Sequence, residues 1–146
     1  APIAGEMSGH IFIADDFYGF DDALYVATRV ISQMVRTGQS ITDFVDKLPN
    51  QHATPEVHIP CSDTEKFPLM ERLSTFAESN YGHNDLTLID GVRVRTKDGW
   101  WLVRASNTEE ALVVRAEGNS IKALDRLVKN IEAALRAAGL KWQAKR

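Results

Sequence analysis

Residues Trp100 to Glu117, WWLVRASNTEEALVVRAE, carry the clearest sign of how the C-terminal part of this 146-residue chain folds. Two apolar runs in it, Trp100–Arg104 and Ala111–Glu117, are rich in aromatic and aliphatic residues and are typical of strands. The hydroxyl-rich segment between them is typical of a turn. The stretch therefore predicts two neighbouring strands joined by a short polar turn.

Two further strands are predicted on the N-terminal side of this pair. Leu86–Arg95 has strand character with a break at Asp90-Gly91, and Lys97–Gly99 has the composition of a hairpin turn. Glu56–Cys61 alternates between apolar and polar residues, which is the period of a strand with one buried face. These segments complete a predicted set of four strands.

Helical spacing of apolar residues predicts a helix on each side of the three C-terminal strands. The first begins at about Glu65, and Pro68 is expected in its first turn. Its apolar face is predicted to hold Phe67, Met70, Leu73, Phe76 and Ala77. The last helix is capped by Ser120 and ends at Gly139. Its apolar stripe is predicted to hold Ile121, Leu124, Val128, Ile131, Leu135 and Ala138.

The order β-α-β-β-β-α predicts an α+β fold: a small open, mainly antiparallel four-stranded sheet with two helices on one face. The polar, proline-flanked segment 49–55 marks a boundary, so we expect one domain over residues 51–146. Residues 1–50 contain a helix from Phe20 to Gly38 and a short helix begun by a Ser40–Asp43 capping box. We interpret them as a helical remnant of another domain, since the chain starts without an initiator methionine.

Composition excludes several classes of function. The net charge of −3 argues against the basic surface that nucleic acid or an anionic membrane requires. No apolar run reaches the roughly 18 residues that span a bilayer. Cys61 is the single cysteine, which is typical of a protein of a reducing compartment, and we expect the cytoplasm.

The turn at Arg104–Glu109, RASNTE, has two interpretations. An arginine followed by Ser106, Asn107 and Thr108 can converge on an anion through its guanidinium, hydroxyls and backbone N–H groups. The same residues are also ordinary turn formers, because they bond their own backbone. Composition alone favours the ordinary turn.

The N-terminal segment Gly5–His10, GEMSGH, also has two interpretations. Glu6, Ser8 and His10 are spaced by two, so an extended segment would present them on one side, with Met7 and Gly9 on the other. A carboxylate, a hydroxyl and an imidazole suit the hydroxyls of a sugar. A polar, solvated surface loop explains the same residues equally well.

The sequence does not support a serine-hydrolase site or a metal site. Ser8 fails the Gly-x-Ser-x-Gly pattern of a hydrolase by one position. The histidines are scattered and Cys61 has no partner at ligand spacing, so no metal site is predicted: His10, His52, His58 and His83. Four aspartates are interpreted as structural helix-cap or turn residues: Asp15, Asp16, Asp21 and Asp22.

Taken together, GEMSGH and RASNTE resemble two signature loops of the α-D-phosphohexomutases. The segments Phe17–Asp22 and Asp90–Val94 resemble the same family, so the similarity covers nearly the whole chain. The phosphomannomutase/phosphoglucomutase branch is the more similar one, since phosphoglucosamine mutases typically carry Gln in place of Met7 and Gly in place of Asn107.

The resemblance implies roles for both loops. Glu6 and Ser8 would contact sugar hydroxyls, and His10 would lie near the reacting groups as a candidate acid/base or orienting residue. Arg104 with Ser106, Asn107 and Thr108 would hold the phosphate that is not transferred. One departure is Glu110, where the family commonly has proline.

Such enzymes interconvert hexose 1-phosphate and hexose 6-phosphate of glucose or mannose through a bisphosphorylated intermediate, with hexose 1,6-bisphosphate as activator. Their phosphoserine loop and their Asp-x-Asp-x-Asp magnesium loop do not occur in these residues. The resemblance thus implies a C-terminal portion: residues 1–50 as the tail of the third, sugar-binding domain, and 51–146 as the phosphate-binding domain. Its expected partners are a phosphosugar and the remaining domains of the parent chain, which supply the magnesium.

Alone, the chain is expected to be inactive. The alternative is a stand-alone, non-catalytic phosphosugar-binding or interaction module. A small open sheet backed by two helices also occurs in nucleic-acid binders, but the acidic charge argues against that function.

Overall fold

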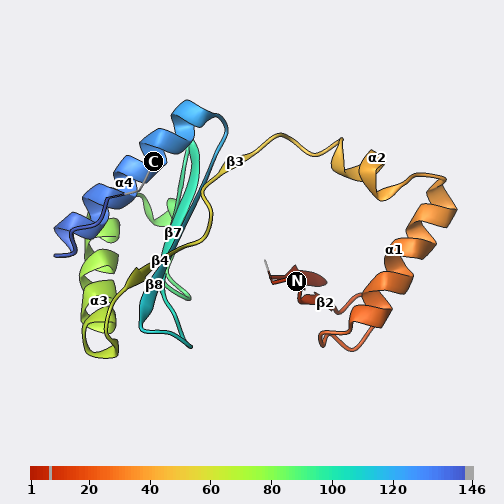
Figure 1. Cartoon of the computed structure of the whole chain (residues 1–146), viewed down its shortest axis with the longest axis horizontal. Coiled ribbons are helices and arrows are strands. Elements are labelled where there is room, and N and C mark those ends of the chain that lie inside the picture. The colour runs from red at the N-terminus through yellow and green to blue at the C-terminus, as the bar shows by residue number, and fades with distance from the viewer. Residues whose placement is uncertain (7, 144–146) are drawn as a thin grey trace. The chain divides into compact units, whose positions relative to one another are not determined.

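The structure, a computed structural model, describes residues 1–6 and 8–143. The chain divides into two compact units, Ala1–Pro49 and Asn50–Arg146 (Figure 1). Each unit is described by itself.

The first unit contains a β-hairpin followed by two helices. Strands β1 (Ile3–Gly5) and β2 (Ile11–Ile13) pair antiparallel. Helix α1 (Ala23–Thr37) begins at Asp22, whose side chain accepts a hydrogen bond from the Tyr25 N–H. A left-handed glycine, Gly38, ends it as predicted.

Helix α2 (Ile41–Val45) carries the predicted capping box. The Ser40 hydroxyl accepts a hydrogen bond from the Asp43 N–H, and the Asp43 carboxylate accepts one from the Ser40 N–H. Among the described residues of this unit only Ile13 is buried. Apolar side chains of α1 and α2 stay exposed: Leu24, Val30, Ile31, Val35, Ile41 and Val45.

The second unit is an antiparallel sheet with two long helices, which confirms the predicted fold class. Its strands follow the order β3-β8-β7-β6-β5, with β4 also paired to β8. The elements are β3 (His52–Ala53), β4 (Val57–Pro60), α3 (Asp63–Asn80), η1 (His83–Asp85), β5 (Leu86–Thr87), β6 (Val92–Thr96), β7 (Gly99–Ala105), β8 (Ala111–Gly118) and α4 (Ile121–Ala137).

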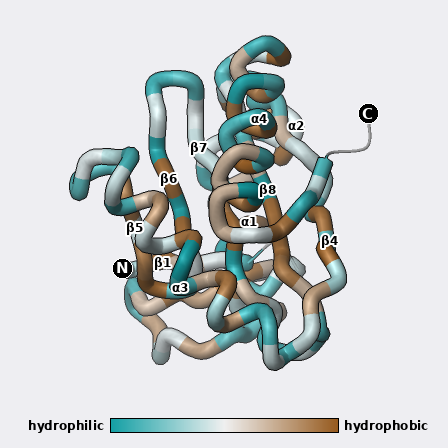
Figure 2. Tube along the Cα trace, turned by 90° about the vertical axis from the view of Figure 1, so that its left-hand side faces the viewer, coloured by the Kyte–Doolittle hydropathy of each residue, from teal (hydrophilic) through white to brown (hydrophobic). Residues whose placement is uncertain are grey.

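The sheet has six strands rather than the predicted four, because β3 was not expected and the predicted strand Leu86–Arg95 forms two strands, β5 and β6. Strand β3 pairs with the end of β8 at Glu117–Gly118, while β4 pairs with its beginning at Ala111–Val114. The predicted break at Asp90-Gly91 separates β5 from β6, and the two then pair antiparallel with each other. The turn between β6 and β7 is hydrophilic and closes at the Thr96–Gly99 pair (Figure 2).

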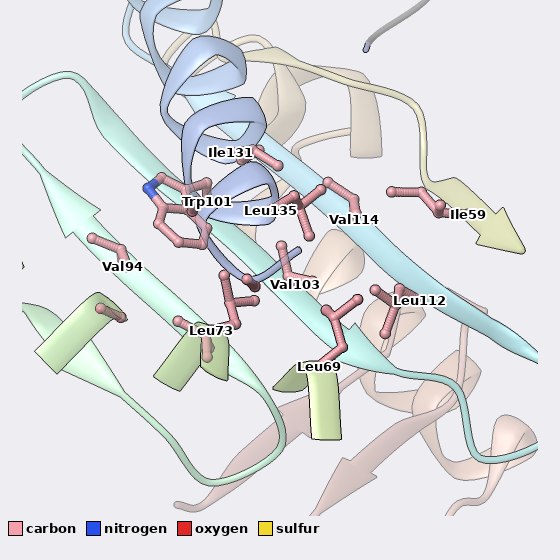
Figure 3. Packing of buried hydrophobic residues seen from close by; sticks show 14 of the residues in the cluster. Ile59, Leu69, Leu73, Val94, Trp101, Val103, Leu112, Val114, Ile131 and Leu135 are labelled. Atoms are coloured by element: carbon pink, nitrogen blue, oxygen red, sulfur yellow. The ribbon is translucent and has the colours of Figure 1, made fainter. Parts of the chain in front are cut away.

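Both helices cover the same face of the sheet and share one core. Trp101 of β7 has no exposed surface and lies with Ile131 and Leu135 of α4 (Figure 3). Leu69 and Leu73 of α3 belong to the same cluster. Burial of such side chains contributes about 1.5–3 kcal/mol each, so this cluster holds the sheet and the helices together.

The buried face of α3 differs from the predicted one. The helix begins at Asp63, and Pro68 lies inside it, beyond the first turn, contrary to the prediction. Phe67 is 58% exposed, and Met70 and Phe76 pack only at the margin of the core. Leu73 and Ala77 are buried as predicted, whereas the buried Lys66 and Leu69 were not expected on this face. Apolar residues surround this helix on several sides, so their spacing alone did not identify the buried face.

Helix α4 shows a smaller shift of the same kind. Ile131, Leu135 and Ala138 are buried as predicted, but Ile121 is 65% exposed. Leu124 is only partly buried and packs at the edge of the core. The small and aliphatic residues that complete the buried face were missed: Ala123, Leu127 and Ala134. The small side chains of Ala123 and Ala134 leave room for α4 to lie close to the sheet.

Candidate functional site

The turn between β7 and β8 is shaped by Ser106, which is 6% exposed. Its N–H donates to the Ala111 carbonyl oxygen at 2.9 Å and thereby closes the turn. Its hydroxyl oxygen accepts hydrogen bonds from the N–H groups of Glu109, at 3.2 Å, and Thr108, at 3.4 Å. The hydroxyl proton is still a free donor in this arrangement, because both bonds use the oxygen as acceptor.

A lysine that sequence reasoning missed supports this turn from the core side. Lys66 of α3 is 4% exposed, and its Nζ donates to the carbonyl oxygens of Ser106, at 2.8 Å, and Glu109, at 3.2 Å. The ammonium also forms an ion pair with Asp63 on its own helix. A buried lysine is stable only when its charge is paired and hydrogen-bonded, and these three partners meet that need.

Arg104 lies at the start of the turn with its side chain partly exposed, at 32%. Its guanidinium is 3.9 Å from the Asp90 carboxylate. Gly91, with φ +104°, lies directly against it, since a Cβ atom there would be 2.6 Å from the Arg104 Cβ. The Asp90-Gly91 break between β5 and β6 therefore fits closely against the backbone that carries Arg104.

The tip of the turn is exposed at Asn107, Thr108, Glu109 and Glu110. The Glu109 carboxylate is 2.7 Å from Nδ1 of His58 on β4. Nε2 of His58 is in turn 3.0 Å from the Glu56 carboxylate. Hydrogen bonds to Glu56 and Glu109 raise the pKa of His58 above its ordinary value. A protonated His58 donates to both carboxylates and offsets the charge of Glu109.

The second candidate loop joins β1 to β2, and it is a turn rather than the extended segment that was predicted. The Glu6 N–H donates to the His10 carbonyl at 2.9 Å, and the Gly9 N–H donates to the Glu6 carbonyl at 3.1 Å. Glu6 and Ser8 meet through a 3.1 Å hydrogen bond from the hydroxyl to the carboxylate. The prediction that Met7 faces the opposite side lies outside the described residues.

His10 hydrogen-bonds through Nδ1 to Asp21, an aspartate that was predicted to be a helix-cap residue. This bond and the Asp21 charge raise the pKa of His10, and the same bond lowers the pKa of Asp21. Asp22 is the residue that caps α1. The assignment of Asp21 to the cap was therefore wrong, because the adjacent residue provides the cap and leaves Asp21 to pair with the imidazole.

The structure thus brings the candidate residues together in two separate groups. Glu6, Ser8 and His10 lie on one hairpin turn of the first unit. Arg104 and residues 106–108 lie on one turn of the second unit. Within residues 1–6 and 8–143, no group of His, Cys, Asp or Glu is arranged to hold a metal ion. None of the described helices has the length and apolar character of a membrane span.

Two family models match the chain along most of its length. Residues 56–134 match the C-terminal domain of phosphoglucomutase/phosphomannomutase. Residues 1–52 match the alpha/beta/alpha domain III of the same proteins. The chain belongs to the phosphoglucomutase/phosphomannomutase family. The predicted membership of the phosphohexomutases, as a C-terminal portion, is confirmed.

Individual relatives agree with this membership. The phosphomannomutase/phosphoglucomutase of Pseudomonas putida is 45% identical over 125 residues, which cover 86% of this chain and 27% of that protein. The phosphoglucomutase of Neisseria gonorrhoeae is 35% identical over 92% of this chain and 29% of its own length. The chain thus spans between a quarter and a third of the length of these relatives.

A solved structure supports the same family. The crystal structure of a phosphoglucomutase/phosphomannomutase family protein from Burkholderia thailandensis matches with a TM-score of 0.79 and 38% sequence identity. The match covers 94% of this chain and 28% of that protein.

Proposed function

We propose that this chain is the C-terminal portion of a phosphohexomutase that interconverts the 1-phosphate and 6-phosphate of glucose or mannose through a bisphosphorylated intermediate. Coverage of 27% of the Pseudomonas putida relative supports a portion of a longer parent protein. Residues 1–50 would be the tail of the third, sugar-binding domain and residues 51–146 the phosphate-binding domain. The matches of the two family models to residues 1–52 and 56–134 support these bounds.

The observation that carries the phosphate-binding role is the turn after β7. Arg104 lies beside it, and Asn107 and Thr108 are exposed at its tip. An arginine offers a planar fork of donors to a phosphate, and each charge-assisted hydrogen bond contributes about 1.5–3 kcal/mol. The Ser106 hydroxyl proton and the Thr108 hydroxyl add donors from the same turn. This turn would hold the phosphate that does not react.

The sugar-binding role belongs to Glu6, Ser8 and His10. The Glu6 carboxylate accepts from Ser8 and has lone pairs left for sugar hydroxyls. His10, whose pKa is raised by Asp21, can donate a hydrogen bond or a proton from its exposed Nε2. His10 is accordingly the candidate acid/base or orienting residue of the chain.

These roles suit a reaction in which the sugar must turn over midway. In either orientation the bisphosphorylated sugar presents one phosphate for transfer and the other for the turn at Arg104. A clamp that recognises phosphate by charge accepts both orientations. Contacts to hydroxyls by short polar side chains can likewise re-form after the sugar has turned.

The nucleophile and the metal would come from other domains of the parent. The Mg²⁺ would be held by carboxylates of a parent domain outside this chain. We expect no turnover from the chain alone. We place the parent enzyme in the cytoplasm, which the single, unpaired Cys61 supports.

Calorimetric titration of the purified chain with glucose 1-phosphate tests this proposal. Arg104→Gln should weaken binding about tenfold to a hundredfold, which corresponds to one lost charge-assisted bond. Arg95→Gln is the matched control, because Arg95 pairs with Trp100 at the opposite end of the β6–β7 ladder. Equal affinity of the wild-type chain for glucose 1-phosphate and for glucose would contradict the phosphate-binding role.

A further inference from the structure

Lys66 bonds the carbonyl oxygens of two peptide planes in the turn after β7, and the Glu109 carbonyl oxygen also accepts from the Ala111 N–H at 2.8 Å. Its Nζ is 2.8 Å from the Ser106 carbonyl oxygen and 3.2 Å from the Glu109 carbonyl oxygen. The turn contains no cis peptide bond, so each C=O is antiparallel to the N–H of the following residue. The N–H groups of Asn107 and Glu110 must therefore point away from the buried ammonium.

Those two N–H groups are the ones the turn leaves free. The N–H of Ser106 is bonded to Ala111, and those of Thr108 and Glu109 are directed at the Ser106 hydroxyl. Among residues 1–6 and 8–143, no group accepts a hydrogen bond from the N–H of Asn107 or Glu110. Outward-facing backbone N–H groups at an exposed turn are anion donors.

We infer that Lys66 is a positioning residue of the phosphate-binding turn: it draws the Ser106 and Glu109 carbonyls inward so that the Asn107 and Glu110 N–H groups face the bound phosphate. This inference rests on the proposed function. It adds two donors to Arg104 and the hydroxyls. In this arrangement Glu110 contacts the phosphate through its backbone N–H, although its side chain is negatively charged.

The burial of Lys66 supports a positioning role over simple filling of the core. The charge of a lysine side chain that is 5% exposed is costly to desolvate, and a methionine of similar length would fill the space without that cost. Both loop carbonyls bonded by Lys66 belong to the turn, 40 and 43 residues further along the chain. These two hydrogen bonds therefore connect α3 to the turn between β7 and β8.

The test uses the whole chain labelled with ¹⁵N and ¹³C and titrated with glucose 6-phosphate. In the wild-type chain, Lys66 Nζ should show a hydrogen-bond correlation to the Ser106 carbonyl carbon. Binding should shift the amide protons of Asn107 and Glu110 downfield more than those of Thr108 and Glu109. Lys66→Met should weaken binding at least tenfold and abolish that pattern of shifts.

Two variants separate positioning from stability. Leu69→Val perturbs the neighbouring core without touching the turn carbonyls, and Lys122→Met removes an exposed lysine of α4. Affinity is compared at equal folded fraction, and both variants should bind like the wild type. Equal affinity of Lys66→Met and the wild type would overturn the inference while leaving the proposed function intact.

The remaining outcomes are also decisive. If the wild-type chain does not bind glucose 6-phosphate, the proposed function fails. Two measurements then decide whether Lys66 orders the turn. These are the correlation between Lys66 Nζ and the Ser106 carbonyl in the wild type, and faster amide exchange at residues 106–110 in Lys66→Met. If Lys66→Met does not fold, the wild-type measurements decide, and shifts that are largest at Thr108 and Glu109 overturn the inference.

Discussion

Nδ1 of His58 lies 2.7 Å from the carboxylate of Glu109, so strand β4 holds a negative side chain of the phosphate-binding turn. Nε2 of the same imidazole is 3.0 Å from Glu56. The Glu109 carboxylate would weaken the binding of a phosphate dianion beside it, because like charges repel. A protonated His58 offsets that charge, and the occupancy of the protonated form depends on pH.

We expect the pKa of His58 to lie above 6.5, because Glu56 and Glu109 both stabilise the imidazolium. The contribution of the protonated His58 to the stability of the fold is then complete below pH 6.5, and it is lost as the pH rises through the raised pKa. Titration of the imidazole protons by NMR measures it. Glu109→Gln should lower the pKa towards 6.5, and Glu110→Gln should change it less. An unchanged pKa in Glu109→Gln would refute the pairing.

The same pair predicts a pH dependence of ligand binding. As the pH rises through the His58 pKa, Glu109 loses its cationic partner and glucose 1-phosphate should bind more weakly. Calorimetry across that range should show the loss in the wild-type chain. Glu109→Gln should make the affinity depend less on pH, because the variant has no carboxylate at position 109 for His58 to offset. A profile that is equally steep in both proteins would exclude Glu109 as the cause.

A second pH-dependent pair is formed by His10 and Asp21. The hydrogen bond and charge of Asp21 raise the pKa of His10, so Asp21→Asn should return it towards 6.5. Asp22→Asn is the matched control, since asparagine also caps helices and Asp22 bonds the Tyr25 N–H rather than His10. Proton NMR of the imidazole measures both variants. Equal shifts in the two would show that general charge, and not the contact, sets the His10 pKa.

Gly91 is expected to be important for stability, because it lies directly against the backbone of Val103 and Arg104. Alanine there meets a left-handed φ of +104° and a Cβ only 2.5 Å from the Val103 carbonyl oxygen. Gly139→Ala is the control, because φ there is +98° but the nearest atom is 3.8 Å from the added Cβ. We expect Gly139→Ala to cost about 1–2 kcal/mol of unfolding free energy. Gly91→Ala should cost about 1–3 kcal/mol more. Equal losses in urea denaturation would contradict the close approach.

The buried face of helix α3 was only partly predictable from the spacing of its apolar residues. The existence of the helix was predictable, but Phe67 and Leu69 could each belong to the core, since Phe67, Met70 and Phe76 form an alternative apolar stripe. The structure buries Leu73, as predicted, but turns Leu69 and Lys66 inward and leaves Phe67 exposed. A lysine next to an apolar position is ordinarily placed on the solvent side, which is why Lys66 was missed.

The two faces of α3 can be compared by mutation. Leu73→Ala should lower the unfolding free energy by about 2–5 kcal/mol, because it leaves a cavity in the core. Phe67→Ala removes a larger side chain, but one that is 58% exposed, and should cost about 0.5 kcal/mol. Urea denaturation of both variants measures the difference. A larger loss for Phe67→Ala would show that the helix packs through its other face.

The candidate site was only partly predictable for a related reason. The turn residues Arg104 and Ser106–Thr108 are contiguous, so their grouping follows from the strand pattern. The contacts of Lys66, His58 and Asp21 join residues that are far apart in sequence, at separations of 40, 51 and 11 positions. The contacts of His58 and Lys66 depend on the register of β4 and on the packing of α3, and the contact of Asp21 depends on how the β1–β2 hairpin meets the start of α1; local patterns specify none of these.

We propose that this chain recognises the phosphate of a phosphosugar and does not transfer it. One ³¹P NMR experiment measures both halves: glucose 6-phosphate with a trace of glucose 1,6-bisphosphate is titrated with the purified chain. We expect the 6-phosphate resonance to shift saturably, the shift to be lost in Arg104→Gln, and no glucose 1-phosphate signal to grow. A resonance that does not respond to the chain, or the steady appearance of glucose 1-phosphate, would contradict the claim.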